Sequence, residues 1–311
     1  MMRHTREWVL GRLTYALWVS ARPHQWIKNA FVFLPVLFAE RVFDPTAWCL
    51  ASATFLIFCL AASGVYLWND VADRAQDRVH PLKKLRPVAS GALPVSTALA
   101  WAGLLAAAAV GLAFAVRLSL GCSIVLYIAL NVLYTRWLRA LVIMDVFCIA
   151  ALFVLRVVTG LVVLQVQFSY WMVILVALLA LFLALNKRRY ELTRLARRAS
   201  EHRPVLQKYS IQLIDQMCAA LMAAVIVAYI LFTVDPRKVA KFGSHNLLFS
   251  TPFVCYGIFR YQYLVFKRGR GGDPAHIVLA DRVMLANLVV WAVVCGLAVY
   301  ARREWIPLPL E

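Results

Sequence analysis

The chain has 311 residues, of which 63% are hydrophobic and only 15% are charged, and its mean hydropathy is +0.74. This composition excludes an ordinary soluble domain and indicates a protein that crosses a membrane several times. The formal net charge of +18 would suit nucleic acid, but the Lys and Arg residues are divided among short loops. We therefore expect lipid headgroups of a bilayer as their partners, and no nucleic acid.

Nine apolar segments predict nine transmembrane helices, since each is close to the ~20 residues that cross a bilayer. The expected spans are residues 27–43, 47–68, 97–116, 118–134, 142–164, 170–186, 212–232, 247–266 and 283–301. Pro35 and Glu40 interrupt the first of them. The sequence thus predicts an all-α polytopic membrane protein in which residues 1–311 form one transmembrane domain with loops capping the cytoplasmic end.

Lys and Arg are shared unevenly between the two sides of this bundle. The N-terminus and every second loop (69–96, 135–141, 187–208 and 267–282) hold 24 of the 33, whereas the opposite loops and the C-terminus hold 7. The positive-inside rule then places the N-terminus and the richer side in the cytoplasm. We expect a multi-pass protein of a bacterial-type inner (plasma) membrane.

An acidic stretch ends the second expected span. Asp70, Asp73 and Asp77 are spaced by three and four residues, so on a continuous helix they share one face, with Asn69 one turn from Asp73. Like charges so close to a membrane need a compensating cation. Oxygen ligands of this kind favour Mg²⁺, which also binds phosphate oxygens; the alternative is a solvated helix end.

Basic residues follow this acidic stretch in the next loops of the same side. Lys83 and Arg86 lie in a loop broken by prolines and a glycine, within reach of phosphates that a metal would hold. The fourth span ends with a phenol and two cations, Tyr134, Arg136 and Arg139. This end of the bundle therefore offers both acidic and cationic groups.

Two further spans carry charges that topology alone does not require. Arg156 follows Asp145 by eleven residues on nearly the same helix face, and an arginine so deep must line a polar cavity or form an ion pair. The sixth span ends in the segment Asn186–Glu191, whose cations suit either an anion site or membrane anchoring; they are Lys187, Arg188 and Arg189.

These features together resemble the UbiA superfamily of intramembrane prenyltransferases. The resemblance rests on nine spans, on Asn69-Asp70-x-x-Asp73-x-x-x-Asp77 and on a fourth helix that contains Tyr134, and it covers essentially the whole chain. In that family a second motif, Asp-x-x-x-Asp on the sixth helix, joins the first in holding Mg²⁺ and a prenyl diphosphate. Here the segment Asn186–Glu191 stands in its place.

Several segments are similar to one branch of that superfamily, the decaprenyl-phosphate phosphoribosyltransferases. They are Arg22–Asn29, His80–Pro87, Leu155-Arg156 and Gly271-Gly272-Asp273-Pro274. The resemblance implies transfer of 5-phosphoribose from phosphoribosyl pyrophosphate to a polyprenyl phosphate, with release of pyrophosphate, for arabinan precursors of the cell wall. One diphosphate and one lipid phosphomonoester require one metal site and one cationic site, as the charges here suggest.

We therefore expect three groups of site residues, with Asp70, Asp73 and Arg156 nearest the chemistry. Mg²⁺ is assigned to Asn69, Asp70, Asp73 and Asp77; the donor phosphates to Lys28, Lys83, Arg86 and Tyr134; and the lipid phosphate to Arg156, Lys187, Arg188 and Arg189. Further candidates are Arg136, Asp145, Glu191, Arg260 and Asp273.

Two other functions remain open from the sequence. The first is a prenyltransferase that uses an aromatic or quinone-precursor acceptor, which the missing second Asp motif disfavours. The second is a lipid or ion transporter, which should carry polar groups along the depth of several helices rather than at their cytoplasmic ends. The oligomeric state is also open, a homo-oligomer included.

Overall fold

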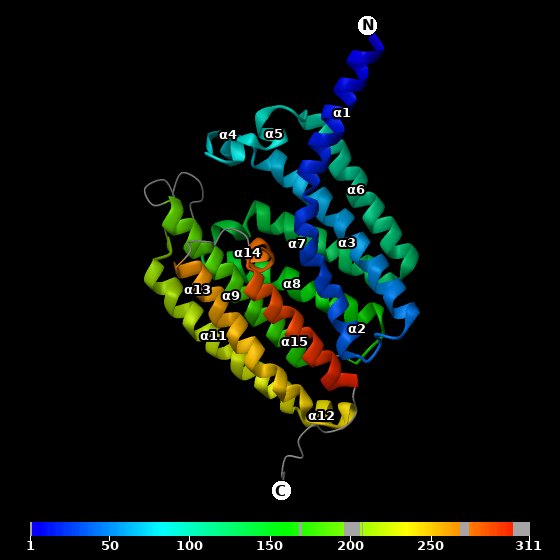
Figure 1. Cartoon of the computed structure of the whole chain (residues 1–311). Coiled ribbons are helices and arrows are strands. Elements are labelled where there is room, and N and C mark those ends of the chain that lie inside the picture. Colours follow the sequence, from blue (N-terminus) through cyan, green and yellow to red (C-terminus); the bar gives the residue numbers. More distant parts are fainter. Residues whose placement is uncertain (1, 168–169, 196–205, 207, 268–273, 301–311) are drawn as a thin grey trace.

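The computed structural model describes residues 2–167, 170–195, 206, 208–267 and 274–300, and in these ranges the chain forms helices and no strand (Figure 1). Within the described ranges, seven helices are long and apolar enough to cross a membrane, which agrees with seven of the nine predicted spans. They are α3 (Pro45–Ala72), α6 (Val95–Val116), α7 (Leu118–Arg136), α8 (Met144–Val163), α9 (Tyr170–Leu195), α11 (Ile211–Val234) and α15 (Arg282–Tyr300).

The first expected span is a broken segment and not one long helix. α1 (Met2–Ala21) ends at Arg22, whose φ of 54° turns the chain into the 3-10 helix η1 (Pro23–Phe33) and the short helix α2 (Leu34–Phe38). Pro23 and Pro35 lie near the start of η1 and α2, where a missing backbone N–H costs no helical hydrogen bond. Proline therefore divides this segment.

The eighth expected span also differs, since it is divided between η6 (Asn246–Ser250) and α13 (Thr251–Lys267), a helix of 17 residues. The count of nine transmembrane helices is therefore not confirmed. The all-α, membrane-spanning class is confirmed by the seven long helices.

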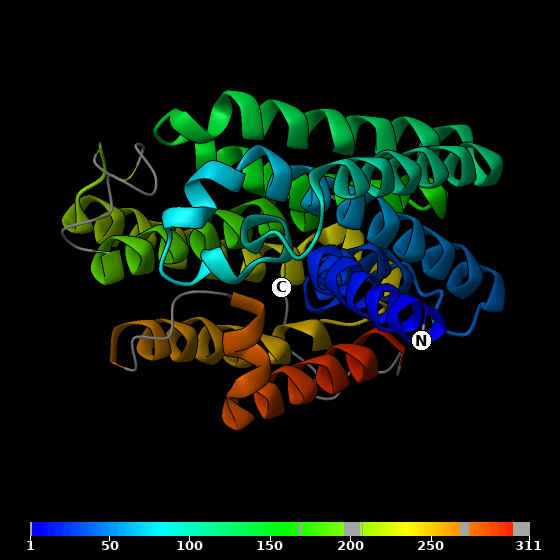
Figure 2. The ribbon, with the colours of Figure 1, turned by 90° about the horizontal axis from the view of Figure 1, so that it is seen from above.

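Short elements lie at the two ends of the bundle. α4 (Arg74–Val79), η2 (Lys83–Leu85) and α5 (Pro87–Ser90) lie at the end near the N-terminus, whereas α12 (Pro236–Phe242) lies at the opposite end (Figure 1). The other short elements are η3 (Leu138–Ala140) and α14 (Pro274–Ala280). Seen from above, α6 and α7 lie on one side of the bundle and α13 and α15 on the other (Figure 2).

A close backbone approach brings η1 into the interior of the bundle. A Cβ atom at Gly160 of α8 would lie 2.7 Å from the carbonyl oxygen of Val32, so only glycine fits there. Val32 is fully buried, and Asn29 of the same element is 1% exposed. The glycine thus lets η1 place Asn29 against α8, where it contacts Arg156.

Candidate active site

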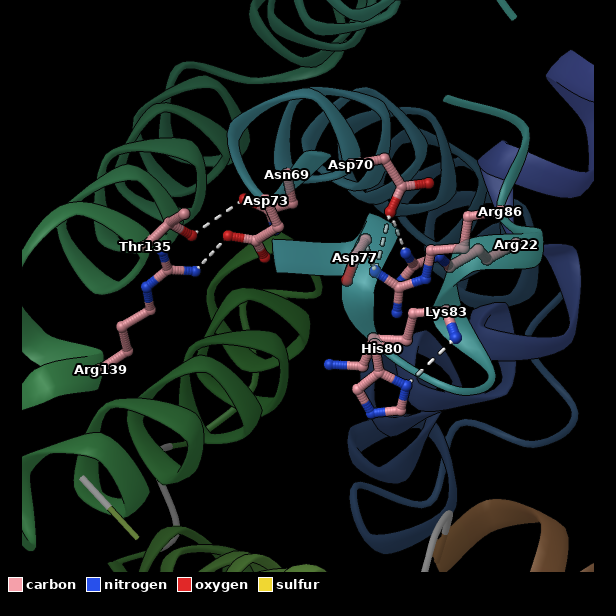
Figure 3. Close-up of polar contacts among 10 residues, drawn as sticks. All are labelled: Arg22, Asn69, Asp70, Asp73, Asp77, His80, Lys83, Arg86, Thr135 and Arg139. Carbon is pink, nitrogen blue, oxygen red and sulfur yellow. Dashed lines mark hydrogen bonds and ion pairs between the residues drawn. The ribbon is translucent and has the colours of Figure 1, made fainter. Parts of the chain in front are cut away.

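The acidic stretch does not lie on one continuous helix. α3 ends at Ala72 and α4 begins at Arg74, so that Asp73 lies at the break with φ −95° and ψ 4°. Figure 3 shows Asp70 and Asp77 directed to one side and Asn69 and Asp73 to the other. The expectation that Asp70, Asp73 and Asp77 share one helix face is therefore wrong, because the chain changes direction between them.

Asp70 and Asp77 converge on one cation. Both are buried, with 1% and 2% of their surface exposed. The Nη1 atom of Arg86 donates to Asp77 Oδ2 at 2.6 Å and to Asp70 Oδ1 at 3.2 Å. Arg22, at the turn before η1, also forms an ion pair with Asp70 (Figure 3). Two buried carboxylates thus share positive charge, which offsets the cost of their desolvation.

Arg22 had no assigned role in the sequence analysis, although it begins a segment that carries the family resemblance. Its guanidinium also lies 5.0 Å from the ring centroid of Tyr66 on α3. The pairing with Asp70 spans 48 residues, so no local spacing could have indicated it. A basic residue directly before a proline that opens a new element was the one signal in the sequence.

Asp73 and Asn69, the other two polar residues of the acidic stretch, contact the end of α7 and the following η3. Arg139 of η3 lies 2.5 Å from Asp73 Oδ1, and Thr135 of α7 donates to Asn69 Oδ1 at 2.9 Å (Figure 3). Within the described ranges, no three His, Cys, Asp or Glu side chains are grouped as ligands of a metal ion. The assignment of Mg²⁺ to these residues stays a prediction.

A buried charge network lies beside the acidic stretch. Arg188 of α9 is 1% exposed, and its Nε donates to Asp145 Oδ2 of α8 at 2.7 Å. Its Nη1 reaches Glu191 at 2.6 Å and its Nη2 reaches the hydroxyl of Tyr134 at 3.4 Å. Tyr209 donates to the other Asp145 oxygen at 2.8 Å. The guanidinium is thus held on all sides.

The end of α7 connects this network with the acidic stretch. Tyr134 contacts Arg188, and the next residue, Thr135, contacts Asn69. Tyr134 was predicted to contact donor phosphates together with Lys83 and Arg86, but the structure groups its hydroxyl with Arg188. Acidic and basic groups from α3, α7, α8 and α9 therefore meet at one end of the bundle.

Arg189 and Lys187 are the two neighbours of Arg188 in the sequence. Arg189 forms an ion pair with Asp215 of α11 at 2.6 Å, and its guanidinium stacks 3.6 Å from the ring centroid of Phe266. Lys187 is half-buried. Of the three consecutive cations, the two arginines are thus tied to carboxylates on α8, α9 and α11.

Arg156 lies deeper in the bundle, eleven residues or about 16 Å along α8 from Asp145. It is 5% exposed. Its three nitrogens donate to Asn29 Oδ1 at 2.8 Å, to the Leu152 carbonyl at 2.6 Å and to the Tyr127 hydroxyl at 3.1 Å. None of these partners is a carboxylate. Among the residues that the structure describes, the charge is held by neutral oxygens and by the Tyr127 ring, 4.8 Å away, and not by an ion pair.

The remaining candidates are spread over several other elements. Lys28 on η1 is half-buried, Lys83 on η2 is exposed, and Arg136 is exposed with its guanidinium 5.9 Å from the ring centroid of Trp68. Arg260 of α13 pairs with Asp281 at 3.0 Å, which ties α13 to the start of α15. Asp273 lies outside the described residues.

Comparison with known proteins gives consistent results. The model of the UbiA prenyltransferase family matches residues 29–284. The chain is 31% identical to the decaprenyl-phosphate phosphoribosyltransferase of Corynebacterium glutamicum, over 90% of this chain and 86% of that protein. It is also 31% identical to the enzyme of the same name from Mycolicibacterium smegmatis, over 90% and 91% of the two chains.

Solved structures share the fold. A UbiA homolog from Archaeoglobus fulgidus bound to GPP and Mg²⁺ superposes with a TM-score of 0.65 at 15% identity, over 92% of this chain and 99% of that one. A UbiA homolog from Aeropyrum pernix K1 gives a TM-score of 0.61 at 17% identity, over 89% and 97%. At such identities the likeness concerns the fold alone.

Proposed function

The chain belongs to the UbiA prenyltransferase family, and on that basis we propose that it transfers 5-phosphoribose from phosphoribosyl pyrophosphate to a polyprenyl phosphate of the decaprenyl type. Pyrophosphate leaves, and the lipid product would serve arabinan precursors of the cell wall. Relatives named decaprenyl-phosphate phosphoribosyltransferase, at about 30% identity over 90% of the chain, support this pair of substrates.

The observation that carries the proposal is the buried Arg188 at the end of α9. In members of the superfamily that use a prenyl diphosphate donor, the resemblance implies a second acidic motif at this position of the sixth spanning helix. Here an arginine is held by Asp145 and Glu191, while the acidic residues stay at the end of α3. With an arginine where a second metal site would need free carboxylates, one metal site is left for a diphosphate donor, and the cations of α8 and α9 are left for a phosphomonoester acceptor.

The side-chain oxygens at the end of α3 are of the kind that binds Mg²⁺. Asp70 and Asp77 already share one cationic atom, Nη1 of Arg86, and carboxylate and amide oxygens are ligands that Mg²⁺ accepts. We assign the metal to these two residues; Asn69 and Asp73, also expected as ligands, are directed to the other side and contact Thr135 and Arg139 in this structure. When bound, the metal would neutralise the charge of a pyrophosphate leaving group.

The protein side chains then have to orient two anions. The bond between C1 of the ribose and the pyrophosphate oxygen breaks, and a bond between C1 and an oxygen of the lipid phosphate forms. The acceptor is already an anion near pH 7, so it needs positioning more than a general base. We assign the donor phosphates to Lys28, Lys83 and Arg86.

The lipid phosphate is assigned to the cations on α8 and α9, which are Arg156, Lys187, Arg188 and Arg189. Arg156 fits this role because its partners are neutral oxygens, which leave its positive charge uncompensated. Arg188 and Arg189 are paired with carboxylates, so their positive charge is balanced in this structure and the assignment rests first on Arg156. The polyprenyl chain would lie among apolar side chains between the helices.

We further propose that this end of the bundle faces the cytoplasm. The excess of Lys and Arg on this side supports that orientation. The acidic stretch, the Lys83 loop and the end of α9 would then share one compartment with the N-terminus.

The test is to incubate the purified protein in detergent with Mg²⁺, labelled phosphoribosyl pyrophosphate and polyprenyl phosphates of several lengths. Labelled lipid and stoichiometric pyrophosphate are expected. Lys187→Ala should mainly raise the KM for the lipid phosphate, by about ten- to hundredfold for a lost contact of ~1.5 to 3 kcal/mol. Turnover of prenyl diphosphate with an aromatic acceptor, with no response to phosphoribosyl pyrophosphate, would refute the proposal in favour of ordinary prenyl transfer.

A further inference from the structure

A second basic cluster lies at the end of the bundle opposite the candidate active site. α12 has only seven residues but carries three cations, Arg237, Lys238 and Lys241. They are three of the 7 Lys and Arg residues that the loops on this side and the C-terminus contain. The positive-inside rule disfavours cations on this side, so membrane orientation does not explain their grouping on one short helix.

All three cations line a cavity of about 290 Å³. Its lining residues come from α12, from α2, from the end of α8 and from the start of α9. The volume is at the lower limit of small-molecule sites, about 300 to 1,000 Å³. The cavity can thus take a small charged group but not a whole lipid.

The positive charge in this cavity is not balanced. Asp235 is the one acidic residue in the described lining, and its Oδ1 accepts the backbone N–H of Arg237 at 2.8 Å, which caps α12. Lys241 Nζ donates to the Phe38 carbonyl at 3.4 Å, and Lys238 Nζ lies 5.5 Å from the ring centroid of Phe232. Three cations face one carboxylate, which leaves a net positive site.

Lys238 shows the consequence of this arrangement. It is half-buried, and burial together with the neighbouring Lys241 lowers the pKa of its ammonium group. A cation that is partly removed from water beside another cation is stabilised by any anion that enters between them. The cavity therefore favours an anion electrostatically.

The remaining lining is mostly apolar and aromatic, with Gln167 and the hydroxyl-bearing Tyr170 as its polar members. Phe38 of α2 and Leu161 of α8 face Trp171 and Met172 of α9 in the same cavity. Trp171 lies in the first turn of the spanning helix α9, where Trp and Tyr are enriched at the boundary between bilayer and water. The cavity thus presents cations on the α12 side and an apolar wall on the other.

We infer that this cavity binds the phosphate group of an anionic membrane lipid, at a site separate from the candidate active site. The phosphate oxygens would contact Lys238 and Lys241, with Arg237 at the entrance, and the first carbons of the lipid chains would lie against Phe38 and Trp171. A soluble phosphate shares the charge but not the apolar part, so the two sources can be distinguished.

The test measures thermal unfolding of the purified full-length protein in detergent, with no substrate present. Dioctanoyl phosphatidylglycerol is titrated, with dioctanoyl phosphatidylcholine and inorganic phosphate in parallel. Lys238→Gln/Lys241→Gln should weaken the apparent affinity for phosphatidylglycerol by about 30-fold, at ~1 kcal/mol for each charge. Arg117→Gln is the matched control, because Arg117 joins α6 and α7 at the same end of the bundle but does not line the cavity.

The inference is supported if phosphatidylglycerol raises the Tm of the wild type and of Arg117→Gln, but that of the double variant only at higher concentration. An equal response to inorganic phosphate, lost in the same variant, would assign the site to a free anion and overturn the lipid. Equal responses to both lipids, or an unchanged response in the double variant, would overturn the site. If the double variant is not folded, Arg237→Gln replaces it, with an expected change of about fivefold. None of these results depends on the catalytic reaction.

Discussion

Replacing Arg188 by Met should strongly destabilise the protein, because the buried Asp145 carboxyl would lose its ion-pair partner. The two side chains are 1% and 0% exposed, and removal of one member of such a pair costs about 3 to 5 kcal/mol. Burial and the Asp145 carboxylate raise the pKa of Tyr209 to about 12, so its phenol stays protonated and still donates to Asp145. We therefore expect the free energy of unfolding to fall by ~3 kcal/mol.

A double-mutant cycle checks this reasoning. The free energy of unfolding is measured in mixed micelles for Arg188→Met, for Asp145→Asn and for both together. Removing both charges should cost less than the sum of the single effects, with a coupling of ~2 kcal/mol or more. Lys187→Met, one residue away and half-buried, is the matched control and should change stability by less than ~1 kcal/mol. Additive effects, or an Arg188→Met protein as stable as the wild type, would show that the pair is not what holds α8 to α9.

Three further predictions test other parts of the structure. Asp70→Asn should lower kcat by ~100-fold or more with the protein still folded. The control Asp235→Asn keeps a helix cap at the opposite end of the bundle and should retain activity. Equal activities of the two variants would remove Asp70 from the site. For the orientation, Gln76, which is exposed, is replaced by cysteine in a protein without its seven native cysteines. This cysteine should not react with an impermeant thiol reagent added to intact cells. Labelling would reverse the proposed orientation. Gly160→Ala should lower the free energy of unfolding by ~1 to 3 kcal/mol, because the new Cβ would lie 2.7 Å from a carbonyl oxygen of η1. The control Gly103→Ala in α6 has open space around it and should be neutral or stabilising. Equal effects of the two substitutions would contradict the close packing at Gly160.

Local patterns predicted the parts of the fold that depend on composition alone. Seven expected spans became long apolar helices, since ~20 consecutive apolar residues are stable in a bilayer only as a helix. The two expected spans that differ contain features that compete with a long helix. Pro35 lies in the segment that became η1 and α2, and the other segment begins with the turns of η6.

The assignment of roles to the candidate site residues stays a prediction, but their positions can be compared with the structure. The acidic residues and the cations of α9 were identified by residue type and place along the chain, but their mutual contacts were not. Spacing placed three aspartates on one face, whereas the break at Asp73 directs this residue away from Asp70 and Asp77. Tyr134 was assigned to the donor phosphates, yet its hydroxyl contacts Arg188, 54 residues further along the chain.

The sequence by itself determined the membrane-spanning class, the distribution of charge between the two ends of the bundle and the identity of the acidic and basic groups, since these follow from residue type and local order. Only the tertiary structure decided which charges meet. It pairs Asp70 with Arg22, Asp145 with Arg188, and Arg156 with neutral oxygens. The reason is physical: a buried charge is stable only beside a partner, and the packing of helices far apart in the chain determines which partner is within reach.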